Sequence, residues 1–470
     1  MSEIVNVHQL VRLIDGWESG QGKRSELLAS TIKSLIDRGR LPAGVRMPSE
    51  RLVATTLGVA RVTVSDAFNI LRDVGALSSR AGVGTFVSSM GSTVSAGGDA
   101  RLQSFLQVRG SDRIDLRNAA PPAVPMVGEV MADLPFENIE PLLRSHGYVP
   151  QGLDGLIEAI CIYYTNLGLP TRYEEVLVTA GAQQAVHLVA SCVIVPGDTV
   201  VVEDPTFRGG IECLRSIGAR LVGVQSGVEG VDLDELETSF RRYRPRLALL
   251  MTTVHNPTGT SISESKRRSI GALADRYNVT VVDDASTSDL LFSDELPRPM
   301  AAFSDNCITI GSASKSFWGG LRIGWIRARA QVLGGLLAAK GAEDLGTSIP
   351  AQLITSRLLP HIDRARAFRR ASLQAALQAV MDDVAIHLPK SSVKRPTGGA
   401  SLWLRLPEGL SASVVCAAAS RDGVDLLPGP TFSISHSFDD HIRIGYAAPR
   451  MLIADGIARL GRTIQRLRPA

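Results

Sequence analysis

The chain has few of the features that mark a disulfide-rich, membrane-spanning or metal-binding protein. Only five of its 470 residues are cysteines, and they are odd in number, scattered and never arranged as Cys-x-x-Cys. This scarcity excludes a disulfide framework and a cysteine-based zinc site, and it predicts reduced, mostly buried thiols. No apolar run reaches the roughly 18 residues of a membrane helix, and the polar N-terminus has no signal-peptide core. We therefore expect a cytoplasmic protein with no membrane segment and no metal site.

A large net charge is also lacking, but the charge is unevenly distributed. The 50 Lys and Arg against 47 Asp and Glu leave +3 overall. Residues 20–90 contain ten basic and five acidic residues, so this segment alone carries ten minus five, or +5. Such asymmetry indicates a polyanionic partner, although a basic face on a small domain often serves only solvation.

The basic segment predicts three short helices. Apolar residues recur at helical spacing in residues 25–38. Pro48-Ser49-Glu50-Arg51 opens a second helix with Ser49 as its N-cap, and Gly58 ends it after barely two turns. A third helix is predicted over residues 61–74. Two short helices joined by a tight turn are typical of a helix-turn-helix.

In a helix-turn-helix, the first residues of the second helix reach the base edges. Here these residues are Arg61, Thr63 and Ser65. Residues 76–87, with Gly82 near the centre, alternate like a two-stranded hairpin and predict a wing that lies along DNA. The alternative for this segment is a small helical cap with no nucleic-acid role. The Ser- and Gly-rich residues 89–112 predict a flexible linker, with a short helix at 102–108.

From about residue 150, β-rich runs alternate with helical stretches, which predicts an α/β domain with a mostly parallel sheet. The predicted strands cover residues 176–178, 199–202, 219–224, 247–252, 280–282 and 307–310, and the helices 182–191, 208–216 and 263–276. Residues 360–470 predict a small subdomain with a helix over 364–380 and strands near 402–406 and 442–445.

Lys315 is the most informative residue of this domain. Ser312 and Ser314 precede it closely, and Arg322 follows seven residues later. Upstream stand His255-Asn-Pro-Thr-Gly259 and the doublet Asp283-Asp284. A lysine that forms a Schiff base needs neighbours that bind the other parts of the cofactor. Hydroxyls and an arginine bind the phosphate, a carboxylate binds the ring nitrogen, and an amide binds the phenolic oxygen. Each motif alone is compatible with a polar surface, but together and in this order they predict a pyridoxal phosphate site.

Residues 113–470 resemble the fold-type-I pyridoxal phosphate enzymes of the aspartate aminotransferase superfamily. Leu41-Pro-Ala-Gly, Met47-Pro-Ser-Glu-Arg51, Arg61-Val-Thr-Val64 and Gly82-Val-Gly-Thr-Phe-Val87 closely resemble the GntR winged helix. The pairing resembles the MocR branch of the GntR transcription factors. It implies a winged helix at residues 1–88, a linker at 89–112, and an α/β aminotransferase-like effector domain at 113–470 that binds pyridoxal phosphate.

The resemblance also implies roles for individual residues. Lys315 would form the Schiff base, Phe207 would stack on the pyridine ring, Asn256 would donate to the phenolic oxygen, and Asp283, rather than Asp284, would pair with the ring nitrogen. The phosphate would be held by Ala182, Gln183, Ser312, Arg322 and, from the other subunit of a head-to-tail homodimer, Tyr148. Arg443 would bind an effector carboxylate, and Arg51, Arg61, Thr63, Ser65 and Gly82 would contact DNA.

Two departures from the family pattern bear on function. Ala60 stands where a Ser or Thr usually caps the recognition helix, which costs about 1 kcal/mol of helix stability. Ser286 stands where a tyrosine usually binds the phenolic oxygen, so we expect slow or undetectable amino transfer. The leading hypothesis is a transcription regulator that senses pyridoxal phosphate, an amino-acid-like carboxylate, or both. A working aminotransferase with an appended DNA-binding domain is the alternative, and a cofactor-free dimerisation scaffold is a third possibility.

Overall fold

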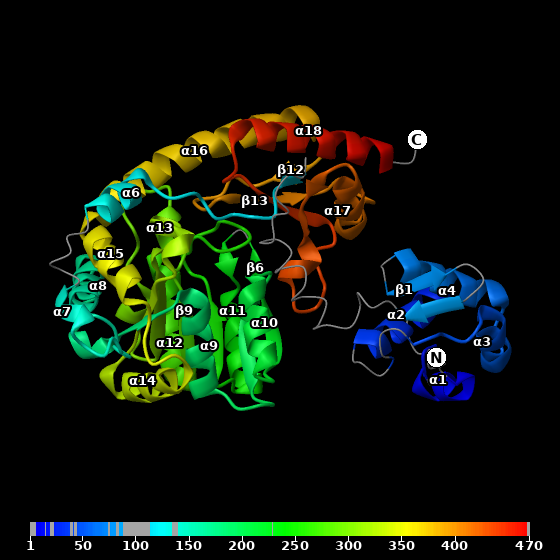
Figure 1. Cartoon of the computed structure of the whole chain (residues 1–470), viewed down its shortest axis with the longest axis horizontal. Coiled ribbons are helices and arrows are strands. Elements are labelled where there is room, and N and C mark those ends of the chain that lie inside the picture. The colour runs from blue at the N-terminus through cyan, green and yellow to red at the C-terminus, as the bar shows by residue number, and fades with distance from the viewer. Residues whose placement is uncertain are drawn as a thin grey trace. The chain divides into compact units, whose positions relative to one another are not determined.

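The computed structural model describes residues 6–14, 16–18, 23–37, 41, 45–73, 76–80, 84–87, 113–133, 140–227 and 229–467. The chain divides into two compact units, Met1–Gln107 and Val108–Ala470, and both are drawn in Figure 1. Gly82 and the predicted linker lie outside the described residues. No helix in the described part of the chain is both long and apolar enough to cross a membrane.

The N-terminal unit contains the three predicted helices and the predicted hairpin. Its elements are α1 (Val7–Leu13), α2 (Arg24–Asp37), α3 (Glu50–Leu57), α4 (Arg61–Asp73), β1 (Leu77–Arg80) and β2 (Gly84–Val87). The Ser49 side chain accepts from the Leu52 amide at 3.3 Å, and Gly58 ends α3 in the left-handed region at φ +67°, so both helix signals are confirmed. The strands β1 and β2 pair antiparallel, with Leu77 opposite Val87.

The helix α1 was not predicted from the sequence. It contributes Leu10 to the apolar core of this unit, and Ile14 and Trp17 follow from the next turn. These side chains pack with Leu28 of α2 and Phe68 of α4. The unit is therefore a winged helix with one additional helix closing its core.

An eight-stranded sheet forms the centre of the second unit, in the order β4-β11-β10-β9-β8-β5-β6-β7. The strands are β4 (Val176–Thr179), β5 (Thr199–Asp204), β6 (Arg220–Gly227), β7 (Gly230–Val231), β8 (Leu247–Leu250), β9 (Thr280–Asp284), β10 (Cys307–Ser312) and β11 (Gly324–Arg327). The five strands β10, β9, β8, β5 and β6 are parallel, whereas β11 pairs antiparallel with both β10 and β4. The predicted mostly parallel sheet is confirmed.

Helices cover both faces of this sheet (Figure 1). One face packs against α9 (Ala182–Val193), α10 (Arg208–Ser216) and α14 (Ala330–Glu343). The other packs against α8 (Asp154–Asn166), α11 (Leu233–Tyr243), α12 (Glu264–Tyr277) and α15 (Ile349–Leu358). Burial on both faces explains why a strand such as β8 is apolar throughout.

The small subdomain begins with the long helix α16 (Ile362–His387), which extends in both directions beyond the predicted residues 364–380. A four-stranded sheet of order β12-β13-β16-β15 packs against α16, α17 (Ala412–Arg421) and α18 (Arg450–Leu467). Its strands are β12 (Ser392–Val393), β13 (Ser401–Arg405), β15 (Leu427–Pro428) and β16 (His441–Gly445). The short strand β3 (Ile114–Asp115) pairs parallel with β14 (Val424–Asp425), so the beginning of this unit belongs to the small subdomain. The remaining helices are α6 (Pro125–Ala132), α7 (Glu140–Leu143) and α13 (Ala313–Ser316).

Candidate functional site

Lys315 lies on the short helix α13, directly after strand β10 ends at Ser312. The Ser312 hydroxyl accepts from the Ser314 amide at 3.1 Å and so caps this helix. Burial, followed by the charges of Arg443 and Arg369, lowers the pKa of Lys315 to about 8, whereas the charge of Asp284 opposes this shift. The neutral amine, which is the form that attacks a carbonyl carbon, is therefore more populated near pH 7 than in an ordinary lysine.

Arg369, from α16, fixes the backbone that carries Lys315. Its Nε donates to the carbonyl oxygens of Lys315 and Ser316 at 3.0 and 3.2 Å, and its Nη2 donates to that of Phe317 at 2.8 Å. These carbonyls come at the end of a helix, where no intrahelical donor is available. Arg369 is only 2% exposed, and the sequence alone did not single it out.

The N-terminus of α9, together with Ser312 and Arg322, forms a cradle for an anion. Gly181 precedes α9 at φ +102°, and a Cβ atom placed on it would lie 2.7 Å from Arg322 Nη2. Arg322 Nη2 donates to the Ala180 carbonyl at 2.8 Å. A Cβ atom on Gly324 would lie 2.8 Å from the Ala182 nitrogen. Glycines at these positions thus let an arginine and the free amides of a helix N-terminus meet, which is the setting that binds phosphate.

Two predicted site residues, Phe207 and Gln183, both lie against Gly209. A Cβ atom there would lie 2.5 Å from the Phe207 ring and 2.7 Å from Gln183 Oε1, so only glycine fits. Gln183 Nε2 donates to the Gly209 carbonyl at 2.9 Å. The Gln183 side chain therefore bonds to α10, and its backbone amide is the group placed at the start of α9.

Asp283 and Asp284 end strand β9 in different surroundings. Asp283 Oδ1 accepts from the Thr252 amide at 3.1 Å and from the Thr252 hydroxyl at 2.9 Å. Asp284 Oδ1 accepts from the Ser286 amide at 3.1 Å, and this carboxyl lies near the charge of Lys315. Burial is the larger cause for both carboxyls and raises the pKa of each above its ordinary value.

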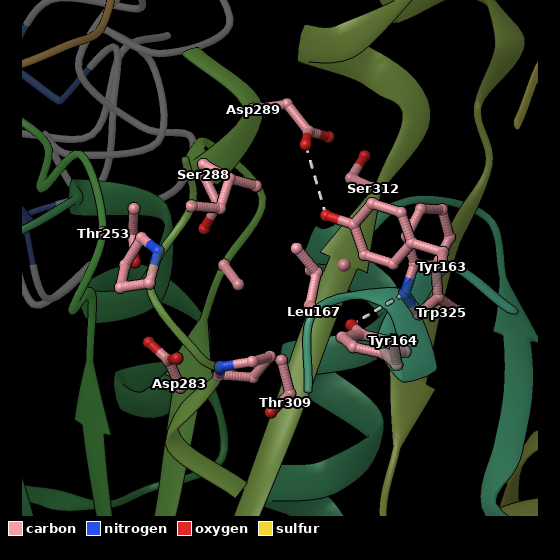
Figure 2. A pocket seen from close by; sticks show the side chains of 15 residues that line it. Tyr163, Tyr164, Leu167, Thr253, Asp283, Ser288, Asp289, Thr309, Ser312 and Trp325 are labelled. Atoms are coloured by element: carbon pink, nitrogen blue, oxygen red, sulfur yellow. Dashed lines mark hydrogen bonds between the residues drawn. The ribbon is translucent and has the colours of Figure 1, made fainter. Parts of the chain in front are cut away.

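Asp283 also lines a cavity of about 20 Å³ between the sheet and α8. Figure 2 shows Thr309 close to Asp283, with Tyr163, Tyr164 and Trp325 on the far wall. Trp325 Nε1 donates to the Tyr164 hydroxyl at 2.9 Å, and Tyr163 donates to Asp289 at 3.3 Å. The cavity has room for about one water-sized molecule, so it is too small for a cofactor.

Arg443 is a buried cation, 6% exposed, at the small-subdomain side of the site. Its Nη1 donates to Asn256 Oδ1 at 3.2 Å, its Nη2 donates to the Arg117 carbonyl, and its guanidinium lies 4.9 Å from the Phe432 ring centroid. Burial, followed by the charge of Arg208, lowers the pKa of Arg443 to about 9, and the charge of Asp115 opposes this shift. Its hydrogen bonds within the described part of the chain go to neutral oxygens, and its Nε is buried without a partner there. A buried cation without a paired carboxylate is suited to an anionic ligand.

Tyr148 is 60% exposed, and its ring stacks on His146 at 5.8 Å. Among the predicted cofactor residues, only Tyr148 and Arg322 are exposed in the single chain.

The candidate DNA-contacting residues of the N-terminal unit lie on α3 and α4. Arg51 and Arg61 are exposed, and Thr63 and Ser65 are half-buried. Arg72 of α4 pairs with Glu50 of α3 at 2.5 Å, which holds the two helices together. The structure adds Arg46, which the sequence did not suggest: a Cβ atom on Gly84, in the wing, would lie 2.6 Å from its Nε.

These two units define a class of protein in which a winged helix-turn-helix and a fold-type-I aminotransferase domain share one chain. Residues 144–454 match the aminotransferase class I and II family, and residues 24–87 match the gntR family of bacterial regulatory proteins. The chain belongs to the aminotransferase class I and II family and carries a GntR-type DNA-binding domain, the combination found in the MocR subfamily.

Similar proteins fall into two groups. An uncharacterised HTH-type transcriptional regulator of Escherichia coli, YdcR, is 28% identical over 90% of this chain and 95% of its own length. The 2-aminoadipate transaminase of Thermus thermophilus is 34% identical over 63% of this chain and 77% of its own length. The crystal structure of the α-aminoadipate aminotransferase LysN from the same organism, complexed with N-(5'-phosphopyridoxyl)-L-leucine, superposes with a TM-score of 0.70 at 28% identity, over 79% of this chain and 95% of that one.

Pyridoxal phosphate is the cofactor of this family, and the residues fit it. The cradle at Gly181 and Arg322 suits the phosphate because it combines helix amides with a guanidinium. Lys315 supplies an amine of lowered pKa beside that cradle. The buried carboxylates that end β9 suit a protonated ring nitrogen.

Proposed function

We propose that this protein is a pyridoxal-phosphate-dependent transcription regulator of the cytoplasm, which binds double-stranded DNA through its winged helix and an amino-acid-like carboxylate through Arg443. The observation that carries the proposal is the buried guanidinium of Arg443, which donates only to neutral oxygens within the described residues. It is joined in one chain to a GntR-type domain. Similarity to HTH-type regulators along nearly the whole chain supports this function.

When bound, pyridoxal phosphate condenses with primary amines and withdraws electrons from the atom next to the imine. We assign the phosphate to the amides of Ala182 and Gln183 with Ser312 and Arg322. Phe207 would stack on the ring, Asn256 would donate to its phenolic oxygen, Asp283 would accept from its protonated nitrogen, and Lys315 would hold its carbonyl carbon. Arg443 would then hold the α-carboxylate of an incoming amino acid by two parallel hydrogen bonds.

Slow or absent turnover is part of this proposal. Ser286 directs its backbone amide to Asp284, and its short side chain replaces the tyrosine that the family pattern places here. The phenolic oxygen would lose one donor, while the phosphate, ring and lysine contacts would remain. A working aminotransferase is the second candidate, favoured by 34% identity to a 2-aminoadipate transaminase.

We further propose a head-to-tail homodimer that reads two half-sites. A symmetric dimer presents two recognition helices to a two-fold related DNA site. The exposed Tyr148 would reach the cofactor phosphate of the second subunit.

The test uses the full chain. Bound sequences are selected from a random double-stranded DNA pool, and the affinity for the selected duplex is then measured by mobility shift with and without pyridoxal phosphate and a panel of amino acids. We expect one class of amino acid to change this affinity, and we expect Lys315→Ala to abolish both the visible absorption of bound cofactor and that response. A response to no amino acid, together with rapid conversion of the bound cofactor to its amine form, would establish the aminotransferase instead.

A further inference from the structure

Arg267 is completely buried on α12, on the face of that helix that packs against the sheet. We infer that Arg267 is a positioning residue for the cofactor ring: acting through Thr252, it holds the Asp283 carboxylate ionised and oriented to accept the ring N–H. This inference rests on the proposed function, in which Asp283 is the partner of the ring nitrogen.

The hydrogen bonds between these three residues have a fixed direction. Arg267 Nη1 donates to Thr252 Oγ1 at 2.5 Å, and its Nη2 donates to the Thr252 carbonyl at 2.8 Å and to Thr253 Oγ1 at 2.6 Å. An arginine can only donate, so the Thr252 hydroxyl accepts from it. The one hydrogen of that hydroxyl is then available for Asp283, whose two oxygens lie 2.9 and 3.0 Å from it. The arrangement is a one-way relay from a cation to a carboxylate.

The electrostatic surroundings of Asp283 explain why a nearby positive charge is needed. Burial raises the pKa of Asp283, and the charge of Arg267 is the largest cause that lowers it. Three other titratable groups influenced by Asp283 are Glu203, with a pKa raised by burial to about 8, Cys307, raised to about 12, and Tyr164, also raised. These three are neutral near pH 7, so they neither offset nor add to the charge of Asp283. The neighbouring Asp284 is also coupled to Asp283; burial raises the pKa of Asp284, and the positive charge of Lys315 opposes that rise. Arg267 therefore supplies the positive charge that favours the ionised form.

The relay also fixes the direction of the carboxylate. Asp283 Oδ1 receives both the amide and the hydroxyl of Thr252, at 3.1 and 2.9 Å. Because two donors come from one residue, the carboxylate plane is fixed and Oδ2 retains capacity to accept from a further donor. A protonated pyridine nitrogen is such a donor, and its N⁺–H···O⁻ bond requires an ionised carboxylate. A neutral ring atom at the same place would gain nothing from the charge of Asp283.

The test compares two ligands on the full-length apoprotein: pyridoxal phosphate and the analogue in which C–H replaces its ring nitrogen. We expect Arg267→Met to weaken pyridoxal phosphate binding roughly tenfold or more, because losing a nearby opposite charge shifts a carboxyl pKa by about one unit or more. Affinity for the analogue should stay within about twofold, since it cannot bond to Asp283. The matched control is Arg268→Met, which removes an exposed arginine from the same helix and should change neither affinity.

Equal loss of both ligands would overturn the inference and leave Arg267 a purely structural role, and no loss of either would also overturn it. If Arg267→Met does not fold, Thr252→Val against Thr252→Ser makes the same comparison, because only serine keeps the relaying hydroxyl. Natural protein that binds neither ligand would refute the proposed function itself. Natural protein that binds both ligands equally would show that Asp283 does not pair with the ring nitrogen, and would overturn the inference alone.

Discussion

Replacing Arg443 with methionine tests whether this cation recognises a carboxylate. Arg443 is 6% exposed, and methionine keeps much of its volume against Phe432. Two charge-assisted hydrogen bonds to a carboxylate are each worth about 1.5–3 kcal/mol. Nη1 and Nη2 already bond to Asn256 and Arg117, so a ligand partly exchanges these bonds instead of adding to them. We therefore take the lower end, about 3 kcal/mol in total, which is roughly a hundredfold loss of affinity.

The stability of the protein should change little in Arg443→Met. Removing a buried cation that lacks a paired carboxylate relieves the cost of desolvating its charge, which is on the order of a few kcal/mol. The oxygens of Asn256 and Arg117 lose a donor in return, at a cost of about 1–3 kcal/mol. The two effects offset each other, so we expect an unfolding temperature close to that of the natural protein.

The assay compares an amino acid with the amine that lacks its carboxylate, such as tyrosine with tyramine. Each ligand is titrated into cofactor-loaded protein, and the change in cofactor absorption gives its affinity. Arg443→Met should weaken the amino acid about a hundredfold and leave the amine unchanged. Arg405→Met, which removes an exposed arginine of β13 paired with Asp440, should change neither. A loss of equal size for both ligands would refute carboxylate recognition by Arg443.

Four further predictions concern the DNA, the cofactor and the assembly. Arg61→Ala should weaken specific DNA binding by about 1–3 kcal/mol without changing cofactor absorption, and unchanged affinity in a mobility-shift titration would rule out this recognition helix. The rate at which apoprotein attaches pyridoxal phosphate should rise with pH through about 8, where Lys315 loses its proton; a rate that is flat from pH 6 to 9 would contradict the lowered pKa. Ser286→Tyr should change the pH dependence of cofactor absorption and raise residual amino transfer, measured in a single turnover. Light scattering of the cofactor-loaded protein should give the mass of a homodimer, and a monomer at micromolar concentration would contradict the assignment of Tyr148.

Much of the site could be predicted because its residues lie in short local motifs. Ser312, Lys315 and Arg322 are brought together by one strand, one helical turn and the segment that follows. Gly181 and Ala182 lie where a strand passes into a helix, and such a junction exposes amides whatever packs around it. The helices α2, α3 and α4 and the hairpin of the N-terminal unit were predicted for the same reason, since caps and turn residues act over a few positions.

Other features differed from the expectation because they depend on distant partners. Strand β8 ends at Leu250, not at residue 252, because the amides of Met251 and Thr252 turn to Glu203 and Asp283. Strand β11 lies antiparallel between β10 and β4, and no local sequence pattern indicates this placement. The helix α1 adds to a core that it shares with α2, α3 and α4, which are distant from it in the sequence.

By itself, the sequence determined the two-unit class of this protein and predicted its lysine and phosphate-binding residues, because these follow from local chemistry and spacing. Only the tertiary structure decided the roles of the buried arginines. Arg267 shares a helical stripe with Ile270 and Ala274, yet in a sequence an arginine there indicates the solvent side of a helix. Arg369 likewise reaches the carbonyls that follow Lys315 across more than fifty residues of chain. Burial of a charge depends on which distant oxygens surround it, and that is settled only when the elements pack together.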